Sequence, residues 1–192
     1  RGEDTRQGAP PHMTPTPGSP LDESVYFWTC NRGKRSIEID IGTTEGRQLA
    51  ARLATEADVL IENFKVGTLA RFGLDYPILS AANPRLIYCS ITGFGQTGPY
   101  RERPGYDTIA QALGGLMSIT GNPDGEPGGG PRKSGIAVAD QMTALYSAVA
   151  NPAATNERHR SGKGQFIDMS LLDVQVAALT NIGMNYLATG KV

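Results

Sequence analysis

The stretch VLIENFKVGTLARFGLDYPILSAANPRLIYCSI, residues 59–91, decides the fold class. It opens with a short apolar run at 59–61 that suits a buried parallel strand, and it closes with a second run at 86–91. Between them lie two short helical patterns, 67–72 and 77–82, the second with Pro77 in its first turn. Two strands joined through helices predict a parallel sheet with flanking helices, which is an α/β fold.

The flanking sequence extends this pattern in both directions. Residues 36–41 alternate polar and apolar side chains, which predicts a strand, and Thr44 is placed to cap the helix that follows. Residues 151 and 152, Asn-Pro, are expected to break or kink a helix, because an interior proline costs about 3 kcal/mol. The later expected elements are helices at 108–116 and 140–150, a strand at 165–168 and a long amphipathic helix at 171–187.

Composition describes a globular chain with little net charge. Its 192 residues carry 18 Lys plus Arg against 19 Asp plus Glu, so no general attraction to nucleic acid or an anionic membrane is expected. No apolar run reaches the roughly 18 residues that a transmembrane helix needs. Two cysteines make no disulfide framework or metal motif, which favours a cytoplasmic protein, or a mitochondrial one in a eukaryote.

Two segments are rich in proline or glycine, and the ends of the chain look cut. Residues 8–24 and 122–134 are expected to form loops. Neither a start methionine nor a signal peptide opens the sequence, so we expect an internal segment of a longer protein.

The segment GFGQTG at 93–98 matches the glycine pattern of dinucleotide-binding loops. That function requires a helix to begin at the third glycine, but Pro99 and Pro104 follow closely. The pattern therefore favours a loop that bends close to a ligand or to another chain.

Basic side chains gather at predicted sheet edges. Residues 63–65, Asn-Phe-Lys, follow a strand directly, where open α/β sheets place ligands, and Arg71 lies close by. Arg32 and Lys34 precede the strand predicted at 36–41. This distribution suits an anionic, phosphate-bearing small molecule, although ordinary solvated surface charge explains it equally well.

Asp140 is the carboxylate that stands out, since it follows an apolar run and opens a predicted helix. From its position alone it is more simply a helix N-cap than a nucleophile. His12 and His159 lie in a proline-rich and a charged segment, so neither is placed to be a general base.

Several stretches together resemble the class III CoA-transferase family, which includes formyl-CoA, carnitine and succinyl-CoA:glutarate CoA-transferases. They occur in the family's order over nearly the whole chain. These stretches are residues 31–37, 57–64, 67–74, 83–88, 93–99, 103–107 and 161–165.

The resemblance implies a function and its site residues. Asp140 becomes the catalytic nucleophile, which forms a mixed anhydride and then an aspartyl-CoA thioester before CoA passes to a carboxylic acid. Coenzyme A is then a substrate, with no prosthetic group, and the implied partners are acyl-CoA, small carboxylic acids and a second copy in an interlaced homodimer. The implied CoA contacts are Asn31, Arg32, Gly33, Lys34, Asn63, Phe64, Lys65, Arg71, Gly105, Tyr106 and Asp107.

The same resemblance implies that residues 1–192 are part of a Rossmann-like large domain, whose first βα unit and following small domain lie outside the sequence.

Two alternatives to the CoA-transferase function stay open. The related α-methylacyl-CoA racemases carry His where this chain has Tyr106, and tyrosine with a pKa of about 10 is a poor acid–base group for α-proton transfer. The second alternative is a truncated remnant that binds CoA without catalysis.

Overall fold

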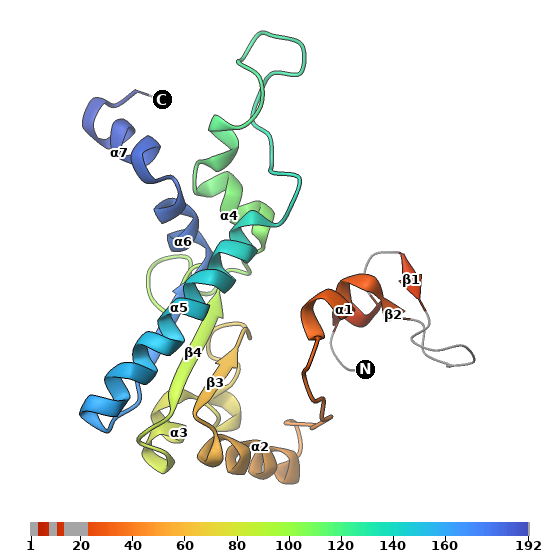
Figure 1. Cartoon of the computed structure of the whole chain (residues 1–192), viewed down its shortest axis with the longest axis vertical. Helices are drawn as coiled ribbons and strands as arrows, with labels where there is room; N and C mark the ends of the chain where they lie inside the picture. Colours follow the sequence, from red (N-terminus) through yellow and green to blue (C-terminus); the bar gives the residue numbers. More distant parts are fainter. Residues whose placement is uncertain (1–3, 8–10, 14–22, 192) are drawn as a thin grey trace. The chain divides into compact units, whose positions relative to one another are not determined.

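The computed structural model describes residues 4–7, 11–13 and 23–191. The chain divides between residues 40 and 41 into two compact units. The smaller unit contains a 3-10 turn, η1 (Asp4–Gln7), and a strand pair, β1 (His12–Met13) and β2 (Glu23–Ser24), followed by α1 (Val25–Asn31) (Figure 1). Ser24 caps α1, because its hydroxyl accepts a hydrogen bond from the Tyr26 amide at 3.2 Å. Most of the predicted loop 8–24 lies outside the described residues.

The strand predicted at 36–41 is wrong, since residues 34–40 form neither helix nor strand and Ile37 is 65% exposed. Polar–apolar alternation shows which face a strand could bury, but it supplies no neighbouring strand for the backbone to pair with.

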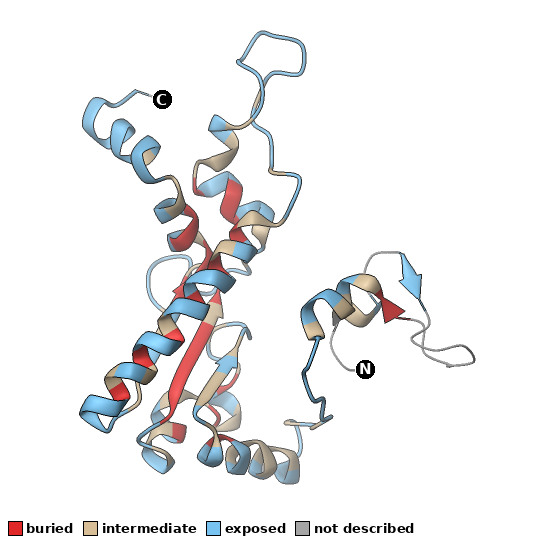
Figure 2. Ribbon diagram, viewed as in Figure 1, coloured by how far each residue is buried: buried red, intermediate tan, exposed pale blue. Residues whose placement is uncertain are grey.

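A parallel three-stranded sheet forms the centre of the larger unit and confirms the predicted α/β class. Its strands are β3 (Val59–Glu62), β4 (Ile87–Thr92) and β5 (Phe166–Ser170), in the order β3-β4-β5. The middle strand β4 is almost wholly buried (Figure 2). Ile61 on β3 is 59% exposed, so this strand is less buried than its apolar sequence predicts.

Helices cover this sheet and build two small cores. One core joins α2, α3 and the sheet through residues that include Ala54, Leu79 and Leu86, and α5 packs along β4 and β5. The helices are α2 (Thr44–Glu56), η2 (Ala70–Phe72), α3 (Tyr76–Ala82), α4 (Asp107–Leu113), η3 (Leu116–Ile119), α5 (Val138–Ser161), α6 (Leu171–Ala178) and α7 (Thr180–Thr189).

Three local predictions about these helices are wrong. The cap of α2 is Thr43, whose hydroxyl accepts from the Gly46 amide, and not Thr44. The helix predicted to break at residues 151–152 continues unbroken through Pro152. The long helix predicted at 171–187 is divided into α6 and α7 at Thr180, whose φ of 47° is left-handed.

The remaining predicted helix, 67–72, is reduced to the short turn η2. Residues 122–134 form turns with one isolated bridge between Asn122 and Gly129. Across residues 4–7, 11–13 and 23–191, no helix is long and apolar enough to cross a membrane.

Candidate active site

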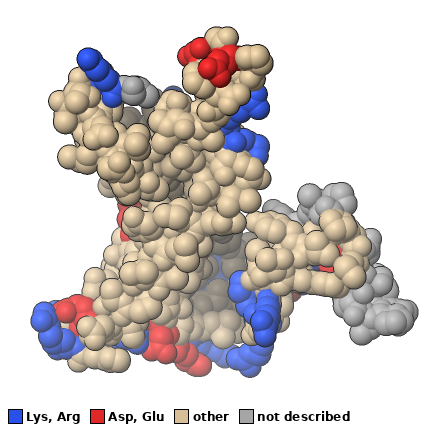
Figure 3. Space-filling view, turned by 45° about the horizontal axis from the view of Figure 1, so that its top comes forward, with Lys and Arg blue, Asp and Glu red and all other residues tan. Residues whose placement is uncertain are grey.

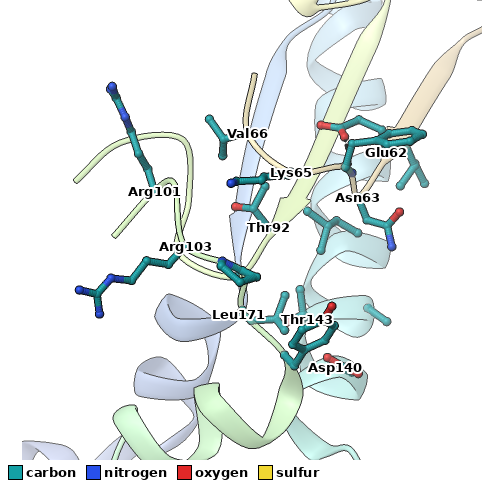
Figure 4. Close-up of a pocket in the computed structure, with 18 residues that line it drawn as sticks. Glu62, Asn63, Lys65, Val66, Thr92, Arg101, Arg103, Asp140, Thr143 and Leu171 are labelled. Atoms are coloured by element: carbon teal, nitrogen blue, oxygen red, sulfur yellow. Dashed lines mark hydrogen bonds between the residues drawn. The ribbon is translucent and has the colours of Figure 1, made fainter. Parts of the chain in front are cut away.

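A cleft of about 530 Å³ opens at the carboxyl ends of the three strands (Figure 4). Its walls come from residues 61–66 at and beyond the end of β3, residues 91–93 at the end of β4, Arg101 and residues 103–106 in the loop that follows, and Leu171 at the start of α6. Asp140 and Thr143 enter it from the first turns of α5. Parallel topology therefore gathers at one edge residues 63–65 and 105–106, which were predicted as ligand contacts.

Asp140 is held at the cleft by the packing of its neighbour. Ala139 is fully buried against Ala110 and Leu171, so the start of α5 is fixed against α4 and α6. Asp140 itself remains exposed to the cleft. Partial desolvation of its carboxyl group, and then the negative charge of Asp107, raise the pKa of Asp140 above its usual value.

Asp140 does not cap its own helix, so the simpler interpretation of its position is wrong. It is the third residue of α5, and the N-cap residue is Ala137, which offers no side-chain oxygen. The carboxylate of Asp107 accepts hydrogen bonds from the amides of Ala139 at 2.8 Å and Asp140 at 3.4 Å. The Asp140 carboxylate is left facing the cleft (Figure 4).

The glycine-rich segment 93–98 starts a closed loop and not a dinucleotide cradle, since no helix begins at Gly98 and the next one, α4, starts only at Asp107. The loop closes where Gly93 meets Gly105 so tightly that a Cβ on Gly93 would lie 2.4 Å from the Gly105 Cα. The backbone N–H of Gln96 donates a hydrogen bond to Asp168 Oδ2 at 2.9 Å and fixes the loop to β5.

This loop brings two cations to the cleft that the sequence prediction missed, Arg101 and Arg103, beside the predicted Lys65. The guanidinium of Arg103 lies 4.2 Å from the ring centre of Tyr100, and both arginine side chains point away from Asp140 in Figure 4. The sequence could have indicated both arginines, because they lie in the loop after a predicted strand, where open α/β sheets place ligands.

The structure brings together most of the predicted site residues of the larger unit. Those that line the cleft are Asp140, Asn63, Phe64, Lys65, Gly105 and Tyr106. Arg71 is exposed on η2, and neither Arg71 nor Asp107 is among the residues that line the cleft. The Asp107 carboxylate accepts a hydrogen bond from the start of α5.

The four remaining predicted contacts belong to the smaller unit. Asn31 ends α1, Arg32 and Lys34 are exposed, and Gly33 has a φ of 72° that makes the turn after the helix. Their contact with CoA remains a prediction. Among the side chains that the structure describes, no group of three or more His, Cys, Asp or Glu could hold a metal ion.

The chain belongs to CoA-transferase family III, whose sequence model matches residues 1–192. It is 54% identical over 190 residues to the succinate–glutarate CoA-transferase of Agrobacterium fabrum, a match that covers 99% of this chain and 46% of that protein. It is 44% identical to the succinyl-CoA:glutarate CoA-transferase of Mus musculus, over 99% of this chain and 41% of the relative.

A solved structure shows the same fold. A CAIB/BAIF family protein from Brucella suis superposes with a TM-score of 0.91 at 55% identity, over 99% of this chain and 48% of that one. The chain thus spans about half the length of the relatives it matches.

Proposed function

We propose that this chain carries the nucleophile of an enzyme that transfers coenzyme A from an acyl-CoA to a carboxylic acid. The observation that supports it most is the carboxylate of Asp140, which is presented to a cleft at the carboxyl edge of the sheet. Lys65, Arg101 and Arg103 in the same cleft supply the positive charge that an anionic substrate requires.

The chemistry proceeds through three covalent intermediates on Asp140. Its carboxylate attacks the acyl-CoA carbonyl and expels CoA thiolate, which leaves a mixed anhydride. The thiolate attacks the Asp140 carbonyl and releases the donor acid, so that CoA is held as an aspartyl thioester. An acceptor carboxylate attacks that thioester to form a second anhydride, and the thiolate then takes the acceptor's acyl group and regenerates Asp140.

The features of the site suit these steps. A thiol with a pKa of about 8.5 is a good leaving group, and a bound thiolate can return before it diffuses away. The start of α5 favours negative charge at Asp140 and so opposes, without cancelling, the effects that raise its pKa. Asn63, Phe64, Lys65, Gly105 and Tyr106 line the cleft as the proposed CoA contacts, and Arg71 with residues 31–34 completes the proposed set.

Succinyl-CoA is the proposed donor, and a short dicarboxylate such as glutarate is the proposed acceptor. Relatives named for succinate and glutarate support this choice at 54% and 44% identity. A further relative, the succinyl-CoA–D-citramalate CoA-transferase of Chloroflexus aurantiacus, is 40% identical.

Racemase chemistry is not favoured. Tyr106 is 73% exposed at the cleft, where that reaction would need a histidine. His159 lies in the last turn of the 24-residue helix α5, far along the helix from Asp140 in its first turn.

A homodimer is the proposed assembly. Leu145 and Val149 on α5 are 61% and 71% exposed, and Leu187 on α7 is 77% exposed. The face of the larger unit drawn in Figure 3 carries most of its charge at the two ends, with a largely uncharged stretch between. Such exposed apolar side chains are typical of surfaces that another chain or segment covers.

The test is CoA exchange by the full-length protein, from succinyl-CoA to a panel of mono- and dicarboxylates. We expect Asp140→Asn to lose about a thousandfold or more in rate, because no other residue supplies the nucleophile. Asp124→Asn, a change in the exposed loop at 122–134, is the matched control and should exchange normally. Absence of exchange with every acceptor in the wild-type protein would contradict the proposed activity. Analytical sedimentation of the same sample tests the proposed homodimer.

A further inference from the structure

The first turn of α5 depends on a side chain from another helix. Helices leave their first amide groups without internal partners, and α5 has no side-chain cap of its own. Asp107, in the first turn of α4, supplies the acceptor: its Oδ1 lies 2.8 Å from the Ala139 nitrogen and 3.4 Å from the Asp140 nitrogen. The carboxylate of Asp107 is thus bonded to the backbone of the residue that carries the proposed nucleophile.

A fully buried glutamine fixes Asp107 in turn. Gln111 is 0% exposed, and its Nε2 donates to Asp107 Oδ2 at 2.7 Å and to the Ile136 carbonyl at 3.3 Å. Its Oε1 accepts from the Ser134 amide at 2.8 Å. One amide side chain therefore joins the capping carboxylate to the segment that leads into α5, and each of its polar atoms has a partner.

We propose that Asp107 and Gln111 form a clamp that positions Asp140 for attack without touching the substrate. This inference rests on the proposed function for the role of Asp140. It gives Asp107 a role different from the CoA contact that the family resemblance implies, because Asp107 is absent from the cleft lining while Tyr106 and Asp140 are part of it. Both side chains are positioning residues and not catalytic ones.

Asp107 also places a negative charge near the carboxylate of Asp140. Asp107 contributes to the raised pKa of Asp140, after desolvation. Neutralising Asp107 should therefore lower the pKa of Asp140 and move the acid limb of the rate profile to lower pH. The other charged or titratable side chains that line the cleft are Glu62, Lys65, Arg101, Arg103 and Tyr106, and they stay unchanged in this comparison.

Two substitutions at Asp107 separate positioning from charge. Asp107→Asn keeps an oxygen that can accept from the Ala139 amide, but it removes the charge and the oxygen that accepts from Gln111 Nε2, whereas Asp107→Ala removes both acceptors. We expect the acyl-CoA KM to stay within about twofold in both variants, and kcat to fall by about a hundredfold in Asp107→Ala, with part of the rate restored by Asn. Both profiles should move to lower pH.

Gln111→Met tests the second half of the clamp, because it keeps the volume and removes the hydrogen bonds. We expect a fall in kcat at constant KM, and Gln48→Met on the exposed side of α2 is the matched control. A rise of more than about tenfold in the acyl-CoA KM of the Asp107 variants, with kcat unchanged, would make Asp107 a substrate contact and overturn the clamp.

A second readout is independent of CoA transfer. Carbodiimide modifies protonated carboxyl groups, so mass spectrometry of the Asp140 peptide over a range of pH reports its titration. We expect the midpoint to move to lower pH in Asp107→Asn, and an unchanged midpoint would overturn the charge coupling. If the wild-type protein transferred no CoA, the proposed function would fail while this titration would still decide the coupling.

Discussion

Opposing electrostatic effects act on Asp140, the proposed nucleophile, and their balance sets the pH range in which its carboxylate is ionised. The N-terminus of α5 favours the anion, whereas desolvation and the charge of Asp107 favour the neutral acid. The net result is a raised pKa. A carboxylate that is easier to protonate is also a stronger nucleophile when ionised, which suits attack on a thioester.

A pH dependence follows from this direction. Only the ionised form of Asp140 can attack, so the single-turnover release of succinate from succinyl-CoA should slow as pH falls through the raised pKa of Asp140. Omitting the acceptor removes the titration of its carboxyl group from the measurement. A release rate that stays constant from neutral pH down to the usual range of an aspartate would contradict this prediction.

At the residue scale, the sequence predicted Asp140 but not its surroundings. The residue was identified by a family resemblance, and its local position suggested a helix cap. The true cap, Asp107, lies 33 residues earlier in the chain. Local sequence rules address contacts within a turn or two and cannot find a partner that only the packing of α4 against α5 provides.

At the scale of elements, α5 continues through Pro152 because its packing outweighs the cost of the proline. The helix buries a stripe that runs from Ala139 to Arg158 against the rest of the unit. Pro152 and Ala148, whose carbonyl loses its amide partner, both lie on exposed positions, so water can satisfy that carbonyl. Propensity predicted the break, and tertiary packing prevents it.

The loop after β4 offers a test of how the cleft wall is built. In Gly93→Ala the new Cβ would lie 2.4 Å from the Gly105 Cα, and a backbone atom cannot yield as a flexible side chain does. We expect a loss of about 1–3 kcal/mol in the free energy of unfolding, together with weaker acyl-CoA binding, since Arg101 and Arg103 are on this loop.

Urea denaturation and acyl-CoA titration measure the two effects of Gly93→Ala. The matched control is Gly135→Ala, because Gly135 has no positive φ and a Cβ there would meet no atom within 4 Å. Equal stability and affinity in the two variants would show that the contact between Gly93 and Gly105 does not hold the loop closed.

At the scale of the larger unit, the two ends of α5 have different tasks. Its first turn carries Asp140, and its last turn carries Arg158, which is only 5% exposed. Arg158 donates to the carbonyls of Asp58 and Arg85 at 3.1 Å each, just before β3 and β4, and to the Asp58 carboxylate at 2.9 Å. The arginine thus fixes the helix to the amino ends of two strands, opposite the cleft.

Arg158→Met should lower the free energy of unfolding by about 2–4 kcal/mol, because it removes the three hydrogen bonds that the buried guanidinium makes to Asp58 and Arg85. Arg160→Met is the matched control, since that side chain is 84% exposed and its loss should cost under about 0.5 kcal/mol. Chemical denaturation measures both, and equal effects would show that Arg158 is not a structural link. The surrounding charged segment predicts exposure, so the burial of Arg158 could be found only from the fold.

The presence of a parallel sheet could be predicted from the sequence more reliably than the bounds of each helix and strand. Apolar runs at 59–61 and 86–91 became β3 and β4, because a short buried run bounded by turns has few alternatives. The strand predicted at 36–41 was wrong, because polar–apolar alternation does not determine whether a partner strand exists. The cleft followed from topology, which gathers the carboxyl ends of parallel strands whatever the loop lengths.

The most direct test of the account follows oxygen atoms through Asp140. Each turnover by the proposed route exchanges one Asp140 carboxylate oxygen for an oxygen of the acceptor, because the second anhydride is broken at the acceptor's carbonyl. The full-length protein would be mixed with succinyl-CoA and glutarate labelled with a heavy oxygen isotope, and the peptide that contains Asp140 analysed by mass spectrometry. We predict that this peptide gains heavy oxygen only when both substrates are present, and that the Asp124 peptide does not. Formation of glutaryl-CoA with an unlabelled Asp140 would show that CoA transfer does not pass through an anhydride at Asp140.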